Sequence, residues 1–219
     1  MARSPKVCRR NELLSQMFVP DFSFERAAPH QPVCGVDEAG RGPWAGPVVA
    51  SAVILNPANI PEGLDDSKKL TAKRRDALFD AINEVAQVGV GIATVQEIDE
   101  VNILQATFLA MRRAVEALPN QPAYALIDGN KVPPHLICDA EAIVKGDGRS
   151  VSIAAASIIA KVTRDRIMVT LAQQFPGYGW ERNAGYGVKA HQEGLNRLGV
   201  TPHHRVSFKP IHKMLYQGN

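Results

Sequence analysis

The sequence of 219 residues has few cysteines and no long apolar run. Its three cysteines, Cys8, Cys34 and Cys138, lie far apart and form no Cys-x-x-Cys pair, so neither a disulfide scaffold nor a zinc cluster is predicted. The longest apolar run, residues 48–55, has the length of a strand and not of a membrane-spanning helix. The first thirty residues lack the apolar stretch of a secretory signal. These absences predict a soluble protein of a reducing compartment, expected to be the cytoplasm, with no membrane partner.

The composition is that of a globular chain. Hydrophobic residues make up 45% and charged residues 21%, which suffices for a sizeable core in one domain, or in one domain with a small appendage. The net charge of +3 is unevenly distributed: residues 1–30 carry +2, residues 31–179 carry −3 and residues 180–219 carry +4. Positive ends around an acidic body suit a polyanion whose reacting phosphate needs metal ions. Solubility is nevertheless the simpler explanation of so small a net charge.

Apolar runs and periodic segments alternate from residue 32 onward. The expected strands span residues 33–36, 48–55, 88–95, 124–127 and 142–145. The expected helices span residues 72–86, 97–118, 152–175 and 188–198, with a short one at the C-terminus. Thr71 is a candidate cap for the first of these helices. Early strands followed by alternation with helices indicate an α/β layered domain with a mixed sheet.

The chain divides into three segments by composition. Residues 1–30 have no sustained periodicity and are expected to form a partly ordered leader. Residues 31–175 contain the alternating elements and are expected to form the core. After Phe175 the sequence turns to Gly, Tyr, Trp, Asn and His, so residues 176–219 are expected to form a C-terminal helical extension.

Two adjacent carboxylates follow the first expected strand. Asp37 and Glu38 would be costly at a buried strand end unless a cation or a proton compensates them. Gly40 and Gly42 let the backbone bend and let a ligand approach it, while Arg41 between them can grip phosphate oxygens. The alternative is an acidic pair that closes a strand at a glycine-rich turn. No Gly-Lys-Ser/Thr sequence follows, so this is not a nucleotide-binding loop.

Two further acids also follow expected strands. Asp128 comes after residues 124–127, at the kind of strand exit where open α/β sheets place ligands, and Asp147 follows residues 142–145. Each alone is also consistent with an ordinary turn. With Asp37 and Glu38 they place carboxylates at three strand ends that a sheet can bring together. Such an oxygen-rich site suits Mg²⁺ or Mn²⁺, and two of these ions about 4 Å apart can promote phosphodiester hydrolysis.

Cations gather before and inside the helix expected at residues 72–86. Lys68 and Lys69 precede it, and Lys73, Arg74 and Arg75 lie in its first turn. Because cations are unfavourable at a helix N-terminus, a bound polyanion would compensate them. For the last three, a solvated charged face is the alternative interpretation.

Two other sets of polar residues have a regular placement. Ser157, Lys161 and Arg164 form one polar stripe on the otherwise apolar helix expected at residues 152–175, and this stripe should face a polar site or water. In the tail, Tyr186 lies among other aromatic residues and cations. That pattern is typical of a nucleic-acid surface and equally of simple packing.

Six motifs occur in order along the chain and together closely resemble bacterial ribonuclease HII. They are residues 35–42 (GVDEAGRG), 66–70 (DSKKL), 126–130 (LIDGN), 145–147 (KGD), 152–165 (SIAAASIIAKVTRD) and 185–187 (GYG). The similarity covers about residues 32–208. So many ordered motifs are far more specific than any one of them.

The resemblance implies a fold and an activity. The fold would be a ribonuclease H-like mixed β-sheet flanked by helices, with a C-terminal helical extension that binds substrate. The activity would be that of an endonuclease cutting the RNA strand of RNA–DNA hybrids and incising at ribonucleotides embedded in duplex DNA. Two Mg²⁺ or Mn²⁺ ions per active site would promote the hydrolysis, leaving 5′-phosphate and 3′-hydroxyl ends. The enzyme is expected to act as a monomer.

The resemblance also implies roles for the matching residues. The metal-binding and catalytic acids would be Asp37, Glu38, Asp128 and Asp147. The substrate-binding residues would be Gly40, Arg41, Gly42, Lys68, Lys69, Ser157, Lys161, Arg164 and Tyr186. The Gly40–Gly42 segment would read the ribose 2′-hydroxyl largely through main-chain groups, because that hydroxyl distinguishes RNA from DNA. Lys68 and Lys69 would hold phosphates, and Tyr186 would stack on the deoxyribose that follows the ribonucleotide.

The sequence departs from the family pattern in two places. Ala184 stands before the Gly-Tyr pair where the family usually has lysine, so one phosphate contact is in doubt. The leader of about thirty residues is longer than a minimal member needs. It is also too short for the N-terminal domain of the sister family, ribonuclease HIII, and therefore favours ribonuclease HII.

Two other functions remain as alternatives to a metal-dependent hybrid endonuclease. The first is a nucleic-acid-binding module in which the acids form structural turns; its binding would persist in the presence of a chelator. The second is a phosphoryl-transfer enzyme that acts on small nucleotides. The lack of a nucleotide-binding loop argues against the second.

Overall fold

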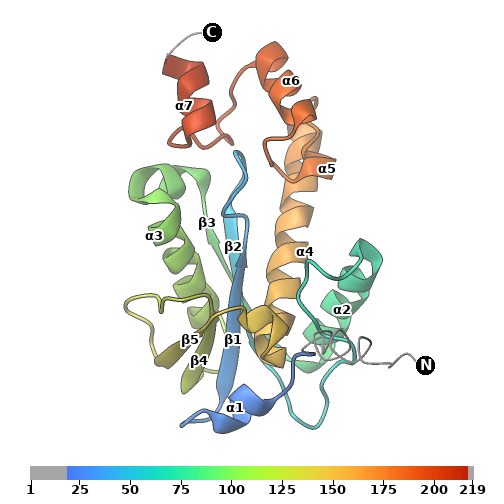
Figure 1. The fold of residues 1–219 in the computed structure, drawn as a ribbon, viewed down its shortest axis with the longest axis vertical. Helices are drawn as coiled ribbons and strands as arrows, with labels where there is room; N and C mark the ends of the chain where they lie inside the picture. The colour runs from blue at the N-terminus through green and yellow to red at the C-terminus, as the bar shows by residue number, and fades with distance from the viewer. Residues whose placement is uncertain (1–18, 217–219) are drawn as a thin grey trace, which may run out of the picture.

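The computed structural model describes residues 19–216, which form a five-stranded mixed sheet with helices on both faces (Figure 1). The strand order is β3-β2-β1-β4-β5. β1 (Val33–Ala39) pairs antiparallel with β2 (Val48–Ile54), and β2 pairs antiparallel with β3 (Gln87–Ala93). On its other side β1 is parallel to β4 (Tyr124–Asp128), which is parallel to β5 (Asp139–Ile143). The expected mixed sheet is therefore confirmed.

The two faces of the sheet are covered by different helices. α3 (Val95–Glu116) packs on one face, and α4 (Val151–Gln174) and α2 (Ala72–Val85) pack on the other (Figure 1). On β2, Ala52 belongs to the cluster with α3, whereas its neighbour Val53 belongs to the cluster with α2 and α4. Because side chains alternate across a strand and both faces are covered, every residue of β2 is buried, and all but Ser51 are apolar.

α4 crosses the sheet directly over Gly35 of β1. A Cβ atom at this position would lie 2.2 Å from the backbone carbonyl carbon of Ser152, so only glycine allows the approach. The contact places the first turn of α4 against the central strand. It thereby brings the chain segment that precedes α4 close to the end of that strand.

The helices α2 and α3 each begin directly after a threonine that caps them. Thr71 caps α2 as expected, because its hydroxyl accepts a hydrogen bond from the Arg74 amide at 3.3 Å. α3 begins two residues before the expected position, since Thr94 and Glu97 form a capping box. Its kink at Asn102, where φ is 70°, was not expected from the sequence.

The last strand differs from the expectation. β5 spans Asp139–Ile143, whereas residues 142–145 were expected. Lys145 adopts a left-handed conformation with φ 56° and leads into a 3₁₀ turn, η1 (Gly146–Gly148), so the chain leaves the sheet earlier. The expected strand was placed too late because Val144 is apolar and was taken as part of it. In the structure Val144 is exposed and lies beyond the end of β5.

The ends of the chain add short helices to the layered core. α1 (Ser23–Ala27) precedes β1. Beyond α4, the elements α5 (Trp180–Asn183), α6 (Lys189–Leu198) and α7 (Lys209–Tyr216) surround an aromatic cluster, which supports the expected helical extension. Residues 1–18 of the expected leader, with Cys8, and residues 217–219 lie outside the described residues. Between residues 19 and 216, no helix combines the length and apolar character that crossing a membrane requires.

Candidate active site

Three aspartates from distant parts of the chain meet at one edge of the sheet. Asp37 lies in β1, Asp128 ends β4 and Asp147 lies in η1. One carboxylate oxygen from each lies within 4.8 Å of those of the other two. The parallel pairing of β1 with β4, in which Val36 lies opposite Ile127, places the next residue of each strand side by side. The convergence expected from the sequence is therefore present for these three acids.

Burial and mutual repulsion disfavour the charged forms of these acids. Asp37 is 4% exposed and Asp147 is 7% exposed. Burial, followed by the charges of Glu38 and Asp128, raises the pKa of Asp37 well above its ordinary value. Burial and the charge of Asp147 raise the pKa of Asp128. A bound cation would relieve this cost, and a donor set made of carboxylate oxygens suits Mg²⁺ or Mn²⁺. The residues present therefore fit a divalent metal site.

Glu38, the fourth predicted acid, lies beside the three aspartates but is not part of that group. Its carboxylate is 3.4 Å from the guanidinium of Arg41. Burial raises the pKa of Glu38, and the Arg41 charge counteracts this rise. Its backbone amide donates to Asp37 Oδ1 at 2.7 Å, which orients the neighbouring carboxylate.

The turn that carries Asp147 is tied to Asp128 through the backbone. The amides of Gly146 and Asp147 donate to Asp128 Oδ1 at 2.7 and 3.4 Å. One oxygen of Asp128 is thus used to hold the turn. The β4 carboxylate and the η1 carboxylate are therefore fixed relative to each other.

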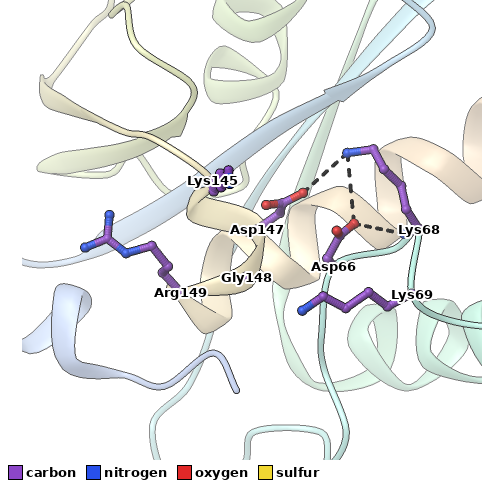
Figure 2. Close-up of a pocket in the computed structure, with 7 residues that line it drawn as sticks. All are labelled: Asp66, Lys68, Lys69, Lys145, Asp147, Gly148 and Arg149. Carbon is purple, nitrogen blue, oxygen red and sulfur yellow. Dashed lines mark hydrogen bonds and ion pairs between the residues drawn. The ribbon is translucent and has the colours of Figure 1, made fainter. Parts of the chain in front are cut away.

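A cationic cavity of about 750 Å³ opens beside Asp147. Figure 2 shows its lining residues: Asp66, Lys68, Lys69, Lys145, Asp147, Gly148 and Arg149. Lys68 Nζ lies 3.4 Å from Asp147 Oδ2, and Lys69 Nζ lies 2.8 Å from Asp65 Oδ1. Lys68 and Lys69 were predicted as phosphate-binding residues, whereas Lys145 and Arg149 of this lining were not predicted as site residues. Both residues lie two positions from Asp147 in the sequence, and this proximity could have suggested them as site residues.

A second cavity, of about 320 Å³, also borders the acids. It is lined by Glu38, Arg41 and Asp128, by residues of α3 and by residues 129–131. Lys131 and Asn130 in this lining were not predicted as site residues. The acidic group therefore has open space beside it that is bounded by at least two cationic side chains, Arg41 and Lys131.

Two buried arginines, Arg164 and Arg205, donate hydrogen bonds to carbonyl oxygens of the Gly40–Pro47 loop. Arg205 donates from Nη1 to the carbonyl oxygens of Arg41 and Pro43 at 2.9 and 2.8 Å, and from Nη2 to that of Gly40. Peptide groups are planar and trans, so a carbonyl aimed at Arg205 directs the following amide away from it. The amides of Arg41 and Gly42 consequently point away from the buried guanidinium. Arg205 was not predicted as a site residue.

Two of the three residues of the predicted polar stripe on α4, Ser157 and Arg164, are buried, and Lys161 is partly exposed. Arg164 is 1% exposed and donates to the carbonyl oxygens of Pro47 and Ala184, both at 2.9 Å. The Ser157 hydroxyl accepts from the Ser67 amide at 3.2 Å, and Lys161 pairs with Asp165 at 2.8 Å. Arg164 and Ser157 thus support the loops that carry Gly40 and Lys68, respectively, and among the described residues the ion-pair partner of Lys161 is Asp165.

Tyr186 stands next to Gly42. Its side chain is 47% exposed, and a Cβ added to Gly42 would lie 3.4 Å from Tyr186 Cε1. The Tyr186 carbonyl oxygen lies 3.0 Å from His191 Nδ1, which ties this residue to α6. The structure thus brings Tyr186 to the Gly40–Gly42 segment, although 144 positions separate Gly42 and Tyr186 in the sequence.

The chain is similar to known proteins over most of its length. The family model described as ribonuclease HII matches residues 34–211. The ribonuclease HII of Ruegeria pomeroyi is 62% identical over 204 residues, which cover 92% of this chain and 87% of that protein. That of Jannaschia sp. is 61% identical over 196 residues, covering 90% and 98%.

Solved structures show the same fold. Ribonuclease H2 from Pyrococcus horikoshii superposes with a TM-score of 0.70 at 30% identity, covering 85% of this chain and 99% of that one. Bst-RNase HIII in complex with Mn²⁺ superposes with a TM-score of 0.69 at 20% identity, covering 84% and 68%. The expected ribonuclease H-like architecture is therefore confirmed.

Proposed function

The chain belongs to the ribonuclease HII family, and from this premise we propose how its residues carry out the activity of that family. It is an endonuclease that hydrolyses the RNA strand of RNA–DNA hybrids. We propose that it also incises at single ribonucleotides embedded in duplex DNA and leaves 5′-phosphate and 3′-hydroxyl ends. The convergence of Asp37, Asp128 and Asp147 within 4.8 Å is the observation that carries this proposal.

In the proposed mechanism, four acids hold two Mg²⁺ or Mn²⁺ ions. Asp37, Asp128 and Asp147 supply oxygens to a common centre, and Glu38 extends the set from the adjacent position on β1. When bound, such ions activate water and stabilise the leaving oxygen in phosphodiester hydrolysis. The raised pKa values of Asp37 and Asp128 show that their charged forms are unfavourable without a compensating cation, which favours the binding of metal ions.

The proposed recognition of the ribonucleotide uses the main chain. Arg205 donates hydrogen bonds to the carbonyl oxygens of Gly40 and Arg41, so the amides of Arg41 and Gly42 point away from the interior. These amides are positioned to meet a 2′-hydroxyl, and the ring of Tyr186 beside Gly42 is positioned to stack on the neighbouring sugar. Glycine at position 42 keeps this approach open.

The proposed path of the phosphates follows the cations. Lys68, Lys69, Lys145 and Arg149 line the cavity next to Asp147, and each can neutralise a phosphate of the bound strand. The C-terminal extension, residues 176–219, contributes Tyr186 and a local excess of basic residues, which supports a substrate-binding role. One chain supplies all of these groups, so we propose that the enzyme acts as a monomer. Its bacterial relatives and its DNA substrate support a cytoplasmic location.

The test uses a DNA duplex that contains one ribonucleotide, a full RNA–DNA hybrid and an all-DNA duplex. We expect cleavage of the first two with Mg²⁺ or Mn²⁺ and none with a chelator, and Asp37→Asn should bind but not cut. Cleavage that persists in Asp37→Asn, or nucleic-acid binding without cleavage by the natural chain, would reject the proposed mechanism. A product with a 5′-hydroxyl would reject the proposed chemistry of bond breakage.

A further inference from the structure

A buried carboxylate from the N-terminal segment reaches the start of α4. Glu25 lies in α1 and is 1% exposed. Figure 1 shows α1 at the end of the sheet where α4 begins. A buried carboxylate is costly unless hydrogen bonds compensate it, so the partners of Glu25 indicate why it is there.

The partners of Glu25 are the first residues of α4. Its Oε1 accepts from the Ser150 hydroxyl at 2.6 Å and from the Ser152 amide at 2.9 Å. Ser150 is the N-cap of α4, and its hydroxyl accepts from the Ile153 amide at 3.2 Å. Glu25 thus extends the cap of α4 and places an acid at the positive end of the helix dipole.

The same segment is bonded to the turn around Asp147 at further points. The Asp21 amide donates to the Arg149 carbonyl at 3.2 Å, and the Val151 amide donates to the Asp21 carbonyl at 3.1 Å. The Arg149 guanidinium lies 4.8 Å from the centre of the Phe24 ring. Residues 21–25 therefore contact the chain at residues 149–152, directly after η1.

These contacts reach Asp147 through the backbone of the turn. The amides of Arg149 and Ser150 donate to the Gly146 carbonyl at 2.9 and 2.8 Å, and the Gly146 amide donates to Asp128 Oδ1 at 2.7 Å. The turn is thus held on one side by Asp128 and on the other by Ser150, which Glu25 fixes in turn. Movement of Ser150 would move Gly146 and, with it, the carboxylate of Asp147.

We propose that Glu25 is a positioning residue for Asp147, fixing through Ser150 and Ser152 the turn that presents this carboxylate to the metal site. The inference rests on the metal-dependent function proposed above. It assigns to the segment before β1 a part in the reaction that the sequence did not indicate. Among the described residues, the Glu25 carboxylate bonds to Ser150 and Ser152 and to none of the four acids, so we expect it to act only through the turn.

The experiment measures Mn²⁺ affinity of the full chain without nucleic acid, by calorimetry or electron paramagnetic resonance. Glu25→Ala should weaken Mn²⁺ binding about tenfold, which is the low end of the range for groups that bond directly to metal ligands, because Glu25 acts through the intervening turn. It should lower kcat with little change in KM. Glu25→Gln keeps the acceptor oxygen and should stay within about twofold of the natural chain.

The matched control is Glu97→Ala. Glu97 also caps a helix, α3, and its partners are Thr94 and Arg113. Removing it should destabilise the fold while leaving Mn²⁺ affinity within about twofold. Thermal unfolding of each variant separates loss of stability from loss of metal binding. If Glu25→Ala does not fold, Glu25→Asp, whose side chain is one methylene shorter, replaces it and should weaken binding several-fold.

A double-variant cycle tests whether the effect passes through Asp147. In an Asp147→Asn background, Glu25→Ala should cause no further loss of Mn²⁺ affinity. The inference is overturned if Glu25→Ala alters only thermal stability, or if its effect on Mn²⁺ affinity adds fully to that of Asp147→Asn. If Asp147→Asn by itself leaves Mn²⁺ affinity unchanged, the proposed metal site fails instead, so the two failures are distinguishable.

Discussion

The Nε2 atoms of His191 and His204 lie 3.1 Å apart in the buried cluster beyond α4. The indole N–H of Trp180 can only donate, so His191 Nε2 accepts from it at 3.1 Å, and His191 Nδ1 donates to the Tyr186 carbonyl at 3.0 Å. His204 Nε2 must then donate to His191, while its Nδ1 accepts from the Thr201 amide at 2.9 Å. Both rings are therefore neutral, with defined tautomers, and together they hold the backbone of Tyr186.

Acid should destabilise the fold through this pair. Burial lowers the pKa of both rings, and that of His204 falls to about 4. Because the unfolded value is about 6.5, the contribution is present above that pH and is lost as the pH falls from about 6.5 to about 4. In urea unfolding, the natural chain should lose about 2 kcal/mol more than His204→Gln between pH 7 and pH 4.5.

The pH dependence of the natural chain alone does not isolate the histidines. The raised pKa values of Asp37 and Asp128 favour the folded state at low pH, which opposes the effect of the histidines, so the natural chain is compared with variants. His212→Gln is the control, since His212 is exposed and its ring lies at a tilt beside that of Tyr216, with the ring centres 4.7 Å apart. It should show the pH dependence of the natural chain. An unchanged pH dependence in His204→Gln would contradict the assignment of neutral rings.

Replacing Arg205 by lysine should damage the loop that carries Gly40 and Arg41. Burial lowers the pKa of Arg205 to about 9, and the guanidinium is stabilised by carbonyl oxygens. An ammonium group cannot reproduce this planar set of donors. Arg205→Lys should cost about 3 kcal/mol in the free energy of unfolding, as expected for a buried charge left with unmatched carbonyl partners.

The same variant should also reduce discrimination between ribose and deoxyribose. We expect kcat/KM for a single embedded ribonucleotide to fall more than nucleic-acid binding does, because the amides of Arg41 and Gly42 lose their orientation. Arg197→Lys serves as the control, since Arg197 donates to one carbonyl, that of Gly177, at 3.3 Å. Equal effects of the two variants on cleavage would argue against a special role of Arg205.

Asp37→Asn should separate stability from activity. Burial and neighbouring charges raise the pKa of Asp37, so without metal its charged form opposes folding at neutral pH. A group with a raised pKa contributes stability at low pH that is lost as the pH rises through its folded-state pKa. Removing this charge should therefore stabilise the metal-free protein by about 1–3 kcal/mol, as relief of an uncompensated buried charge does.

The measurement is unfolding in the presence of a chelator, together with the cleavage rate in Mg²⁺. Cleavage should fall by at least about a hundredfold, while added Mg²⁺ or Mn²⁺ should stabilise the natural chain more than the variant. Asp139→Asn is the control, because Asp139 is exposed at the start of β5. A metal-free Asp37→Asn variant less stable than the natural chain would contradict the electrostatic account.

The sequence predicted the sheet from local periodicity and predicted the convergence of the acids, but only Asp128 stands at a strand end: Asp37 lies inside β1, which extends three residues beyond the expected 33–36, and Asp147 lies in η1. β2 and α4 were placed within one residue at each end, since a strand buried on both faces and a long apolar helix leave clear patterns. The supporting contacts could not be predicted in this way. Arg205 bonds to Gly40, and Glu25 bonds to Ser152, across 165 and 127 positions of sequence, and no local pattern encodes such pairings.

The ring of Tyr186 should contribute to substrate binding and not to bond breakage. It is half-exposed, stands beside Gly42, and has its backbone fixed by His191, so its position does not depend on the ring itself. Loss of a stacking surface costs about 1–3 kcal/mol, which corresponds to a rise of about 5- to 150-fold in KM. Tyr186→Ala should therefore raise KM for a duplex with one ribonucleotide and leave kcat within a few-fold. Tyr186→Phe, which keeps the ring, should stay close to the natural chain, and Tyr216→Ala tests an exposed tyrosine away from Gly42. If kcat falls in Tyr186→Ala while KM is unchanged, the ring acts on the reacting groups and stacking does not explain its role.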